Sequence, residues 1–481
     1  MTETASISPL RSGTAGLALS VLVASLGTSA ANVALPTIAG TFDASFSQTQ
    51  WVALAYLLAM TATSLTVGHL GDLLGRRRIL WIGITVFTAA AVLCTLAPTL
   101  GVLTAARAVQ GVGAAVMMAL PLALARDLVA PERLGRVMGL LGTTAAVGTA
   151  AGPALGGLAI TVAGWPAIFA VMVPLGGLAA IAAIRIGRDA PPTDAPRRRF
   201  DGGGAVLLTT AVTLYTLGVT APAAESWPTL PLLGGAVVTA ALFALRERHA
   251  PHPLLPPALF RNRDVTIGAT LNLIVGTVMM STLVVGPFFL AGGLHLAPAA
   301  IGATMAAGPI ASICTGVIAG RAVDRFGTRS MSTTGLSAMI VGALALALLP
   351  SSWGLPGYIT GTVLLAPGYQ LFLAANNTGV MNATPAERRG VTSGLLGLSR
   401  NLGLVTGASV LASLFAAASG SSSGSTQIAA ASPEALTDAL RATFLVTAAL
   451  LGVATLLSLA TSRDGSAAGK STRGTASATT R

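Results

Sequence analysis

The chain has 481 residues, of which 53% are hydrophobic and 9% are charged, and its mean hydropathy is +0.77. Because soluble domains carry roughly 25% charged residues, this chain cannot cover a water-facing surface and is predicted to be an integral membrane protein. Its net charge of +12 does not indicate nucleic acid as a partner, since the basic residues stand in short clusters between apolar runs, as they do beside a membrane.

Fourteen apolar runs are predicted to be membrane-spanning helices, because a bilayer core of about 30 Å needs about 20 residues of helix. The first run is too long for a cleaved signal peptide, and further spans follow it. In chain order the predicted spans are 14–38, 50–70, 79–97, 100–125, 137–162, 167–184, 203–220, 230–245, 265–290, 298–320, 331–349, 355–380, 391–418 and 442–461.

The arginines predict the orientation of these spans. If the N-terminus lies inside, the inner loops collect nearly all the basic clusters, among them residues 76–78 and 197–199. The outer loops then carry acids such as Asp43 and Glu225, and Arg441 is their one arginine. Since cytoplasmic loops are enriched in Lys and Arg, we expect a multi-pass protein of the bacterial cell (inner) membrane with both termini in the cytoplasm.

Two loops repeat one pattern, G-x-x-x-D-x-x-G-x-R, at residues 68–77 and 320–329. Their aspartates, Asp72 and Asp324, are 324 − 72 = 252 positions apart. Six spans with their loops account for most of that separation and leave room for one extra helix pair. The repeat therefore predicts two related six-helix halves with two helices between them.

The spans and the repeat together predict the division of the chain. The segments are a cytoplasmic tail (1–13), an N-terminal six-helix bundle (14–184), a Pro- and Arg-rich cytoplasmic linker (185–201), a central helix pair (202–245), a second cytoplasmic linker (246–263), a C-terminal six-helix bundle (264–462) and a polar, disordered cytoplasmic tail (463–481). Residues 419–432 are predicted to form a flexible outer loop.

The first copy of the repeat is a candidate cytoplasmic gate. Its three glycines permit a tight connection between two helices, and Asp72 can pair with the arginines or face the N-terminus of a neighbouring helix. Such contacts can form in one conformation and break in the other. A plain turn with membrane anchors would explain the arginines but not Asp72 with its spaced glycines. The candidate gate residues are Gly68, Gly71, Asp72, Gly75, Arg76 and Arg77.

Arg107 is the only charged residue between positions 100 and 125. At 1.5 Å per residue it would lie about 10 Å below the outer end of its helix. An embedded arginine costs at least ~2.5 kcal/mol unless it faces the bundle interior or water. Gln110 follows three residues later on the same face. The pair is either a polar centre for coupling or substrate binding, or a satisfied structural arginine.

Arg400 would lie about 15 Å deep in the thirteenth span, with Asn401 beside it. It could attract an anionic or polar group of a substrate, or pair with a helix C-terminus. Asn376 and Asn377 add polar groups to the twelfth span, where interhelical hydrogen bonds are the alternative to a binding role.

The fifth span places glycines at every fourth position, Gly148, Gly152 and Gly156, which gives one smooth face for close helix packing. Pro153 removes a backbone hydrogen bond and permits a bend.

In this combination the chain resembles the major facilitator superfamily, and in detail its fourteen-span drug:proton antiporter branch. The loop after the second span resembles that superfamily's cytoplasmic gate motif, and residues 32–36, 51–56, 253–262 and 399–403 are also similar to the branch. The fourth span matches a further motif with Leu103, Arg107, Gln110, Gly111, Gly113 and Ala115, and the fifth matches the antiporter motif with Gly148, Gly152, Pro153, Gly156 and Gly157.

The resemblance implies an all-α membrane fold of two six-helix bundles plus two central helices. It also implies export by alternating access and a part for Arg107 in proton coupling. One departure is Gly27, which stands where the branch usually carries an aspartate in the first span. None of the 16 acidic residues is predicted to lie near mid-membrane. Because an embedded carboxylate is the usual carrier of a proton or partner of a cation, its absence weakens the case for proton coupling and for cationic substrates.

The predicted function is efflux of a moderately hydrophobic drug, antibiotic or secondary metabolite, with protons as the candidate coupling ion. The alternatives are import of a small metabolite and, from another class, a membrane-embedded enzyme or sensor. No span carries paired acids, a histidine pair or a nucleophile beside a base, and no phosphate-binding loop occurs. We therefore predict no catalytic residues, cofactor or metal, and we expect a monomer whose partners are a small-molecule substrate and the lipid bilayer.

Overall fold

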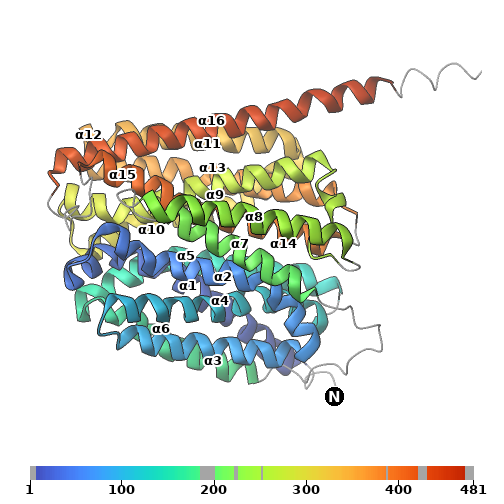
Figure 1. Ribbon diagram of the computed structural model, residues 1–481, viewed down its shortest axis with the longest axis horizontal. Coiled ribbons are helices and arrows are strands. Elements are labelled where there is room, and N and C mark those ends of the chain that lie inside the picture. Colours follow the sequence, from blue (N-terminus) through green and yellow to red (C-terminus); the bar gives the residue numbers. More distant parts are fainter. Residues whose placement is uncertain are drawn as a thin grey trace, which may run out of the picture.

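The computed structural model describes residues 7–129, 131–184, 201–220, 226–250, 253–385, 388–420 and 431–471. Every regular element in these ranges is a helix. Figure 1 shows the long helices side by side along one common direction, with α16 (Pro433–Ser471) extending beyond the others at its C-terminal end.

In the first group of helices, α1 packs against four of the others, α2, α4, α5 and α6. Within it, α4 also lies against α2 and α3, and α3 lies against α6. Close approach is possible because small residues face one another across these contacts, as at Gly113 of α4 and Gly83 of α3. The six helices are α1 (Ile7–Phe42), α2 (Phe46–Leu74), α3 (Arg76–Thr95), α4 (Leu100–Leu128), α5 (Pro131–Ala163) and α6 (Pro166–Ile184).

The last group repeats this arrangement with interruptions. Two of its helices pass through a π-helical stretch, Phe289–Gly293 after α9 and Gly407–Leu411 between α14 and α15. The short α12 (Pro350–Trp353) joins two long helices. Besides α16, the other helices are α9 (Arg263–Phe288), α10 (Pro298–Phe326), α11 (Thr328–Leu348), α13 (Leu355–Asn382), α14 (Arg389–Thr406) and α15 (Ala412–Ala418).

The helices α7 (Gly202–Thr220) and α8 (Ser226–His249) form a pair between these groups in the chain. They pack on each other, and α7 also contacts α2 of the first group and α14 of the last. After α8, a short 3₁₀ turn, Pro257–Leu259, leads into α9.

Each of the fourteen predicted spans coincides with a helix, and the predicted all-helical membrane fold is confirmed. Among the described residues, thirteen helices are long and apolar enough to cross a membrane. The remaining predicted span, 50–70, lies within α2, which is 29 residues long.

Several helices extend beyond the predicted spans, because a helix does not end where its apolar run ends: each added residue forms one more backbone hydrogen bond. The first helix begins at Ile7, inside the predicted tail, and α8 continues to His249, inside the predicted second linker. Ser432 caps the start of α16, and that helix continues to Ser471, inside the tail predicted to be disordered. Residues 185–200 of the predicted linker 185–201, residues 421–430 of the predicted outer loop 419–432, and the end of the tail, 472–481, lie outside the described residues.

The two copies of the repeated pattern fold into the same connection. Gly75 joins α2 to α3 with φ = 93°, and Gly327 joins α10 to α11 with φ = 85°. A positive φ is accessible to glycine without steric cost. The last glycine of the pattern therefore lets one helix follow another with no loop between them, in both halves of the chain.

The helix bundle has two ends, the Phe46 end and the Gly75 end. The Phe46 end holds the connection between α1 and α2, and the Gly75 end holds the connection between α2 and α3. At the Phe46 end, the ring of Phe46 lies 4.6 Å from that of Phe288 and 6.3 Å from that of Phe415, measured between centroids. The first and last groups are therefore in contact at this end.

Two seams join the groups along their length, and they differ. In one, α5 packs directly on α10, where Gly157 faces Gly302 so closely that a Cβ on either would overlap the other helix. In the other, α2 and α14 contact each other, and α7 contacts both of them. Thr209 of α7 donates to the carbonyl oxygen of Ala62 at 3.5 Å, and the hydroxyls of Tyr215 and Thr406 are 2.7 Å apart.

Candidate functional site

Arg107 is completely buried inside the first group of helices, with 1% of its surface exposed. Its Nε donates to the carbonyl oxygen of Val52 at 3.0 Å, and its Nη1 donates to Oε1 of Gln110 at 2.6 Å. The predicted pairing of Arg107 with Gln110 therefore exists. Hydrogen bonds to a charged group contribute about 1.5–3 kcal/mol each, so these two fix the plane of the guanidinium.

Two aromatic rings cover the remaining faces of this guanidinium. Its central carbon lies 4.1 Å from the ring centroid of Tyr56 and 5.7 Å from that of Phe169. The hydroxyl of Tyr56 donates to the carbonyl oxygen of Ala24 at 3.0 Å and accepts from Thr28 at 3.3 Å. Cation–π contacts of a desolvated cation contribute about 2 kcal/mol. Within the described ranges no carboxylate pairs with Arg107, so carbonyl, amide and aromatic groups balance its charge.

The glycines of the fourth span explain how Arg107 reaches Tyr56. A Cβ at Gly111 would overlap the carbonyl oxygen of Tyr56, and one at Gly113 would lie 2.7 Å from the carbonyl oxygen of Gly83. Only glycine lets α4 approach α2 and α3 this closely. Leu103 and Ala115 of the same motif are buried.

Gly27 lies at the edge of this cluster. A Cβ on it would be 2.9 Å from Cζ of Phe87 and 3.3 Å from the hydroxyl of Tyr56. A side chain at position 27 would therefore point at the aromatic wall beside Arg107. Gly27 therefore stands at a position from which an acidic side chain would point toward Arg107.

Arg400 and its neighbours differ from the Arg107 cluster in leaving polar atoms unpaired. Arg400 is half-buried, and its Nε is buried without a hydrogen bond. Oδ1 of Asn401 and Oδ1 of Asn377 are also buried without a partner. One turn earlier in α14, nothing lies within 4 Å of where a Cβ on Gly397 would be. Buried polar atoms without a partner are uncommon in a packed core, so Arg400 and Asn401 stay candidates for a binding role.

Asn376, in contrast, joins helices. Its Nδ2 donates to the carbonyl oxygen of Gly268 at 3.0 Å and to Oδ1 of Asn272 at 3.4 Å. Asn272 in turn donates to the carbonyl oxygen of Leu396 at 3.2 Å. These bonds connect α9, α13 and α14, which is the interhelical alternative for Asn376.

The gate candidates lie at the Gly75 end. Arg77 donates from Nη2 to the carbonyl oxygen of Ile184, the last residue of α6, at 2.8 Å. This is a favourable place for a cation, because carbonyl groups at a helix C-terminus carry partial negative charge. A Cβ on Gly71 would lie 2.9 Å from Cδ2 of Leu120. The side chain of Asp72 and the surroundings of Gly68 lie outside the described residues, so the predicted contacts of Asp72 stay a prediction.

The glycines of the fifth span lie against α1. A Cβ on Gly148 would be 2.7 Å from the carbonyl oxygen of Leu22, one on Gly152 would overlap Ser29, and one on Gly156 would be 2.9 Å from the carbonyl oxygen of Ala30. Gly157 faces α10 instead, and the carbonyl oxygen of Pro153 faces the same helix at Gly302. The motif thus packs α5 against two helices, one from each group.

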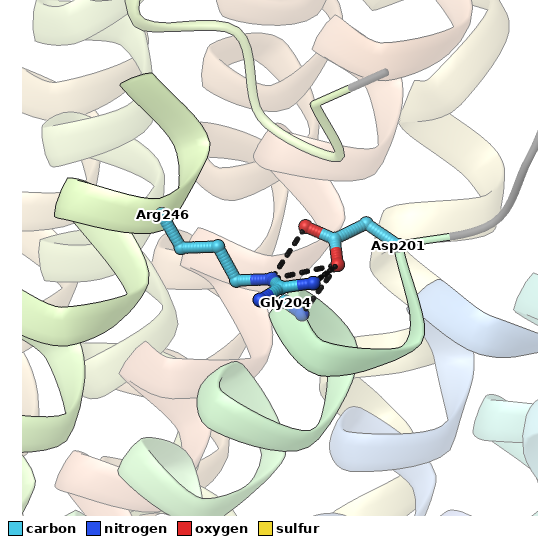
Figure 2. A network of polar contacts seen from close by, with 3 residues as sticks. All are labelled: Asp201, Gly204 and Arg246. Atoms are coloured by element: carbon cyan, nitrogen blue, oxygen red, sulfur yellow. Dashed lines mark hydrogen bonds and ion pairs between the residues drawn. The ribbon is translucent and has the colours of Figure 1, made fainter. Parts of the chain in front are cut away.

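Sequence reasoning missed an acid–base cluster at the end of α8. Figure 2 shows Arg246 beside Asp201, with Nη2 2.7 Å and Nε 2.8 Å from Oδ1 of the carboxylate. The hydrogen bonds from Arg246 hold the pKa of Asp201 below its ordinary value. Next to them Glu247 is only 3% exposed. It stands between two arginines, Arg246 and Arg248, inside the predicted cytoplasmic linker 246–263.

A cavity of about 1,100 Å³ lies between α2, α4 and α7, toward the Phe46 end. Its lining is mostly apolar and includes Trp51, Ala55 and Ala108, with Thr104 and Thr213 among its polar groups. Neither Arg107 nor Arg400 lines it. It is therefore separate from both arginine clusters.

A helical membrane protein in two groups, with a repeated helix connection and buried cationic groups between its helices, has the features of a secondary transporter. The chain belongs to the major facilitator superfamily, whose family model matches residues 17–408 and 265–480. It is therefore a membrane transporter rather than an enzyme.

Three named relatives cover most of the chain. The riboflavin transporter RibZ of Clostridioides difficile is 30% identical over 401 residues, which are 83% of this chain and 87% of the relative. The multidrug resistance protein Stp of Mycobacterium tuberculosis is 32% identical over 391 residues, covering 80% and 72%. The tetracenomycin C resistance and export protein of Streptomyces glaucescens is 29% identical over 403 residues, covering 83% and 75%.

Solved structures share the fold at low sequence identity. A bacterial homologue of the human lysosomal transporter Spinster, in an inward-facing and unoccupied conformation, has a TM-score of 0.67 at 16% identity and covers 96% of this chain and 98% of its own. The nucleoside transporter NupG has a TM-score of 0.62 at 13% identity, covering 92% and 99%.

Proposed function

We propose that this protein exports moderately hydrophobic, neutral or anionic small molecules from a bacterial cell by alternating access. Its relatives include proteins named for multidrug resistance and for tetracenomycin C export. In this proposal both termini lie in the cytoplasm, so the Gly75 end is the inner end and the Phe46 end is the outer end.

The observation that carries the proposed substrate class is the charge of the embedded groups. Arg107 has no carboxylate partner in the described chain, and Nε of Arg400 is buried without any partner. At low dielectric constant, a permanent cation near these groups meets repulsion and no attractive acid. An unpaired guanidinium instead favours a substrate with a carbonyl, hydroxyl or acidic group.

The contacts between the groups agree with a conformation closed at the outer end, which exporters and importers both pass through. Phe46 with Phe288 and Phe415 brings the groups together at the outer end, and Gly157 against Gly302 closes one seam near the same end. A conformation closed on the outside is the one in which an exporter collects its substrate. Arg77 and the rest of the gate motif lie at the inner end, where they are placed to break and form contacts as the groups rock.

Uptake or release of test compounds by vesicles that contain the reconstituted protein tests the substrate class. We expect the wild type, under an imposed pH gradient, to move an uncharged aromatic compound such as riboflavin at least tenfold faster than ethidium, a permanent cation. Equal or faster transport of ethidium would contradict the charge argument.

A substitution at Gly27 tests the same argument from the opposite side. Gly27→Asp directs a carboxylate toward Tyr56 and Arg107 and requires the end of the Phe87 ring to shift. We expect it to raise the ratio of ethidium to riboflavin transport. Gly27→Asn is the matched control, since it has the same shape without the charge, and it should leave that ratio unchanged.

Import of a small metabolite is the second candidate, and it is supported by the relative that is named a riboflavin transporter. The two directions are distinguished in whole cells that overproduce the protein. Export predicts a lower internal concentration of the test compound than in cells without the protein, and import predicts a higher one.

A further inference from the structure

Glu247 is a buried acid that forms no ion pair among the described residues. Only 3% of its surface is exposed. Its Oε2 accepts a hydrogen bond from the backbone N–H of Leu255 at 2.8 Å, and the backbone N–H of Leu254 also acts on the carboxyl group. Its Oε1 is buried and has no hydrogen-bond partner within the geometric limits of a hydrogen bond. A carboxylate oxygen in that position is strongly unfavourable, but a neutral carboxyl group is tolerated there.

The neighbouring cation is already engaged. Arg246 uses Nε and Nη2 on the carboxylate of Asp201, at distances from 2.7 to 3.0 Å, and the N–H of Gly204 binds the same carboxylate at 2.9 Å (Figure 2). Asp201 is therefore satisfied as an anion. Both acids are buried, but Arg246 contacts only Asp201 directly. Of two buried acids beside one arginine, the one without a direct ion pair is the one that keeps a proton.

The absence of a side chain at Gly204 brings the two acids together. A Cβ there would be 2.7 Å from Oδ2 of Asp201 and 3.0 Å from Oε1 of Glu247. Among the described residues, the charged groups that act on Glu247 are Asp201 and Arg246. Arg248 and His249 are exposed at the end of α8, and residues 253–259, which pack on Glu247 through Leu255, contain no titratable side chain.

Glu247 lies where the central helix pair meets the last group of helices. Leu255 belongs to an apolar cluster with Val212 of α7, Phe243 of α8 and Leu396 of α14. The bond from Leu255 to Glu247 therefore fixes the central helix pair to the last group of helices. The contact between Glu247 of α8 and residues 253–259 is called the joint. Because α7 also contacts α2 through Thr209, the joint lies beside the interface between the two groups of helices.

We propose that Glu247 is a proton-binding site of this transporter, which takes the place of the acid that is missing at Gly27. The neutral carboxyl group keeps the joint between α8 and residues 253–259 closed. When its O–H bond breaks, the proton passes to water at the Gly75 end, which the half-exposed Arg246 borders, and the remaining carboxylate opens the joint to water. That this proton drives transport rests on the proposed function; that Glu247 binds a proton does not.

Infrared spectroscopy of the purified protein in lipid nanodiscs, without substrate, tests the site itself. A titration starts below the ordinary glutamate pKa of about 4.3. We expect the carbonyl absorption of a protonated carboxyl group to persist at pH values at which exposed glutamates are ionised, and to be lost in Glu247→Gln. The control is Glu434→Gln, at an exposed glutamate in the first turn of α16, which should keep the absorption. Identical spectra for Glu247→Gln and wild type would overturn the proposal.

Transport by the same variant tests coupling. Gln resembles the neutral acid and can keep the hydrogen bond from Leu255. We therefore expect Glu247→Gln to exchange riboflavin across the vesicle membrane at the wild-type rate when no pH gradient is present. Under a pH gradient, we expect its transport rate to be at least tenfold lower than that of the wild type. Glu247→Asp should recover part of the driven transport. Loss of both activities in Glu247→Gln would mean a structural role, and retention of both would mean that this proton is not coupled. If wild type moves no test compound, the proposed function fails while the infrared result still stands or falls separately.

Discussion

At the scale of single residues, Arg107 shows what a sequence can and cannot predict. Its burial and its pairing with Gln110 follow from helical spacing, since residues three apart share a face. Its bond to the carbonyl oxygen of Val52 and its stacking on Tyr56 come from a separate helix. No local pattern specifies a contact between residues 55 positions apart. Gly111 is the one sequence feature related to this contact, and it does not indicate which helix packs against it.

Substitution of Arg107 tests whether shape or charge matters at this position. Lysine keeps the charge but cannot bond Val52 and Gln110 at once through a planar group. Because a hydrogen bond to a charged group contributes about 1.5–3 kcal/mol and 1.4 kcal/mol is a factor of ten, we expect Arg107→Lys to transport at least about tenfold more slowly and Arg107→Ala to be inactive. Initial rates in vesicles measure this. Arg441→Lys, at an exposed position on α16, is the control, and normal transport by Arg107→Lys would show that charge alone is sufficient.

Glu247 shows the opposite case, in which local sequence misleads. Basic neighbours on both sides are typical of a solvated segment, and the apolar run ends two residues earlier. The burial arises from Leu255 and Gly204, which approach from a later turn and from a different helix. A single acid inside a basic cluster is the only signal in the sequence that could have identified it.

At the scale of helices, the membrane-spanning segments could be predicted from the sequence, whereas the contacts between the two groups of helices could not. Apolarity over about 20 residues determines that a helix crosses the membrane, which is why every predicted run coincides with a helix. The partner of each helix depends on side-chain shape. Gly148, Gly152 and Gly156 predicted a packing face, but nothing in the sequence indicated that α1 fills it while Gly157 meets α10.

The seam between α5 and α10 gives a prediction at this scale. A side chain at Gly302 would overlap the carbonyl oxygen of Pro153, so Gly302→Val should hold the groups apart near the Phe46 end. We expect this variant to reach the membrane in normal amounts. Its transport rate should be at least tenfold lower than that of the wild type, because overpacking an interface costs about 1–3 kcal/mol. Gly177→Val in α6 is the control, since nothing lies within 4 Å of a Cβ there. Full activity of Gly302→Val would mean that this seam need not close tightly during transport.

At the scale of the whole molecule, the two halves repeat in sequence but not in their seams. Gly75 and Gly327 form the same connection, yet α5 and α10 meet without a third helix, whereas α2 and α14 contact each other and also α7. The inserted pair therefore breaks the symmetry of the twofold repeat. It also brings Asp201, Arg246 and Glu247 beside the seam that it occupies, so the titratable cluster and the asymmetry have one origin.

The orientation of the molecule gives the last prediction. In the bundle, α1 begins and α16 ends at the Gly75 end, because the helices that join them alternate in direction. Chain direction alone does not say which end is cytoplasmic; the arginines of the loops decide it, since translocating a basic loop against the membrane potential is unfavourable. We expect reporter fusions at Arg198 to give a cytoplasmic signal and fusions at Glu225 and Ser421 to give an external one. An external signal at Arg198 would place the Phe46 end in the cytoplasm, and the closed contacts of Phe46 would then belong to a conformation open to the outside.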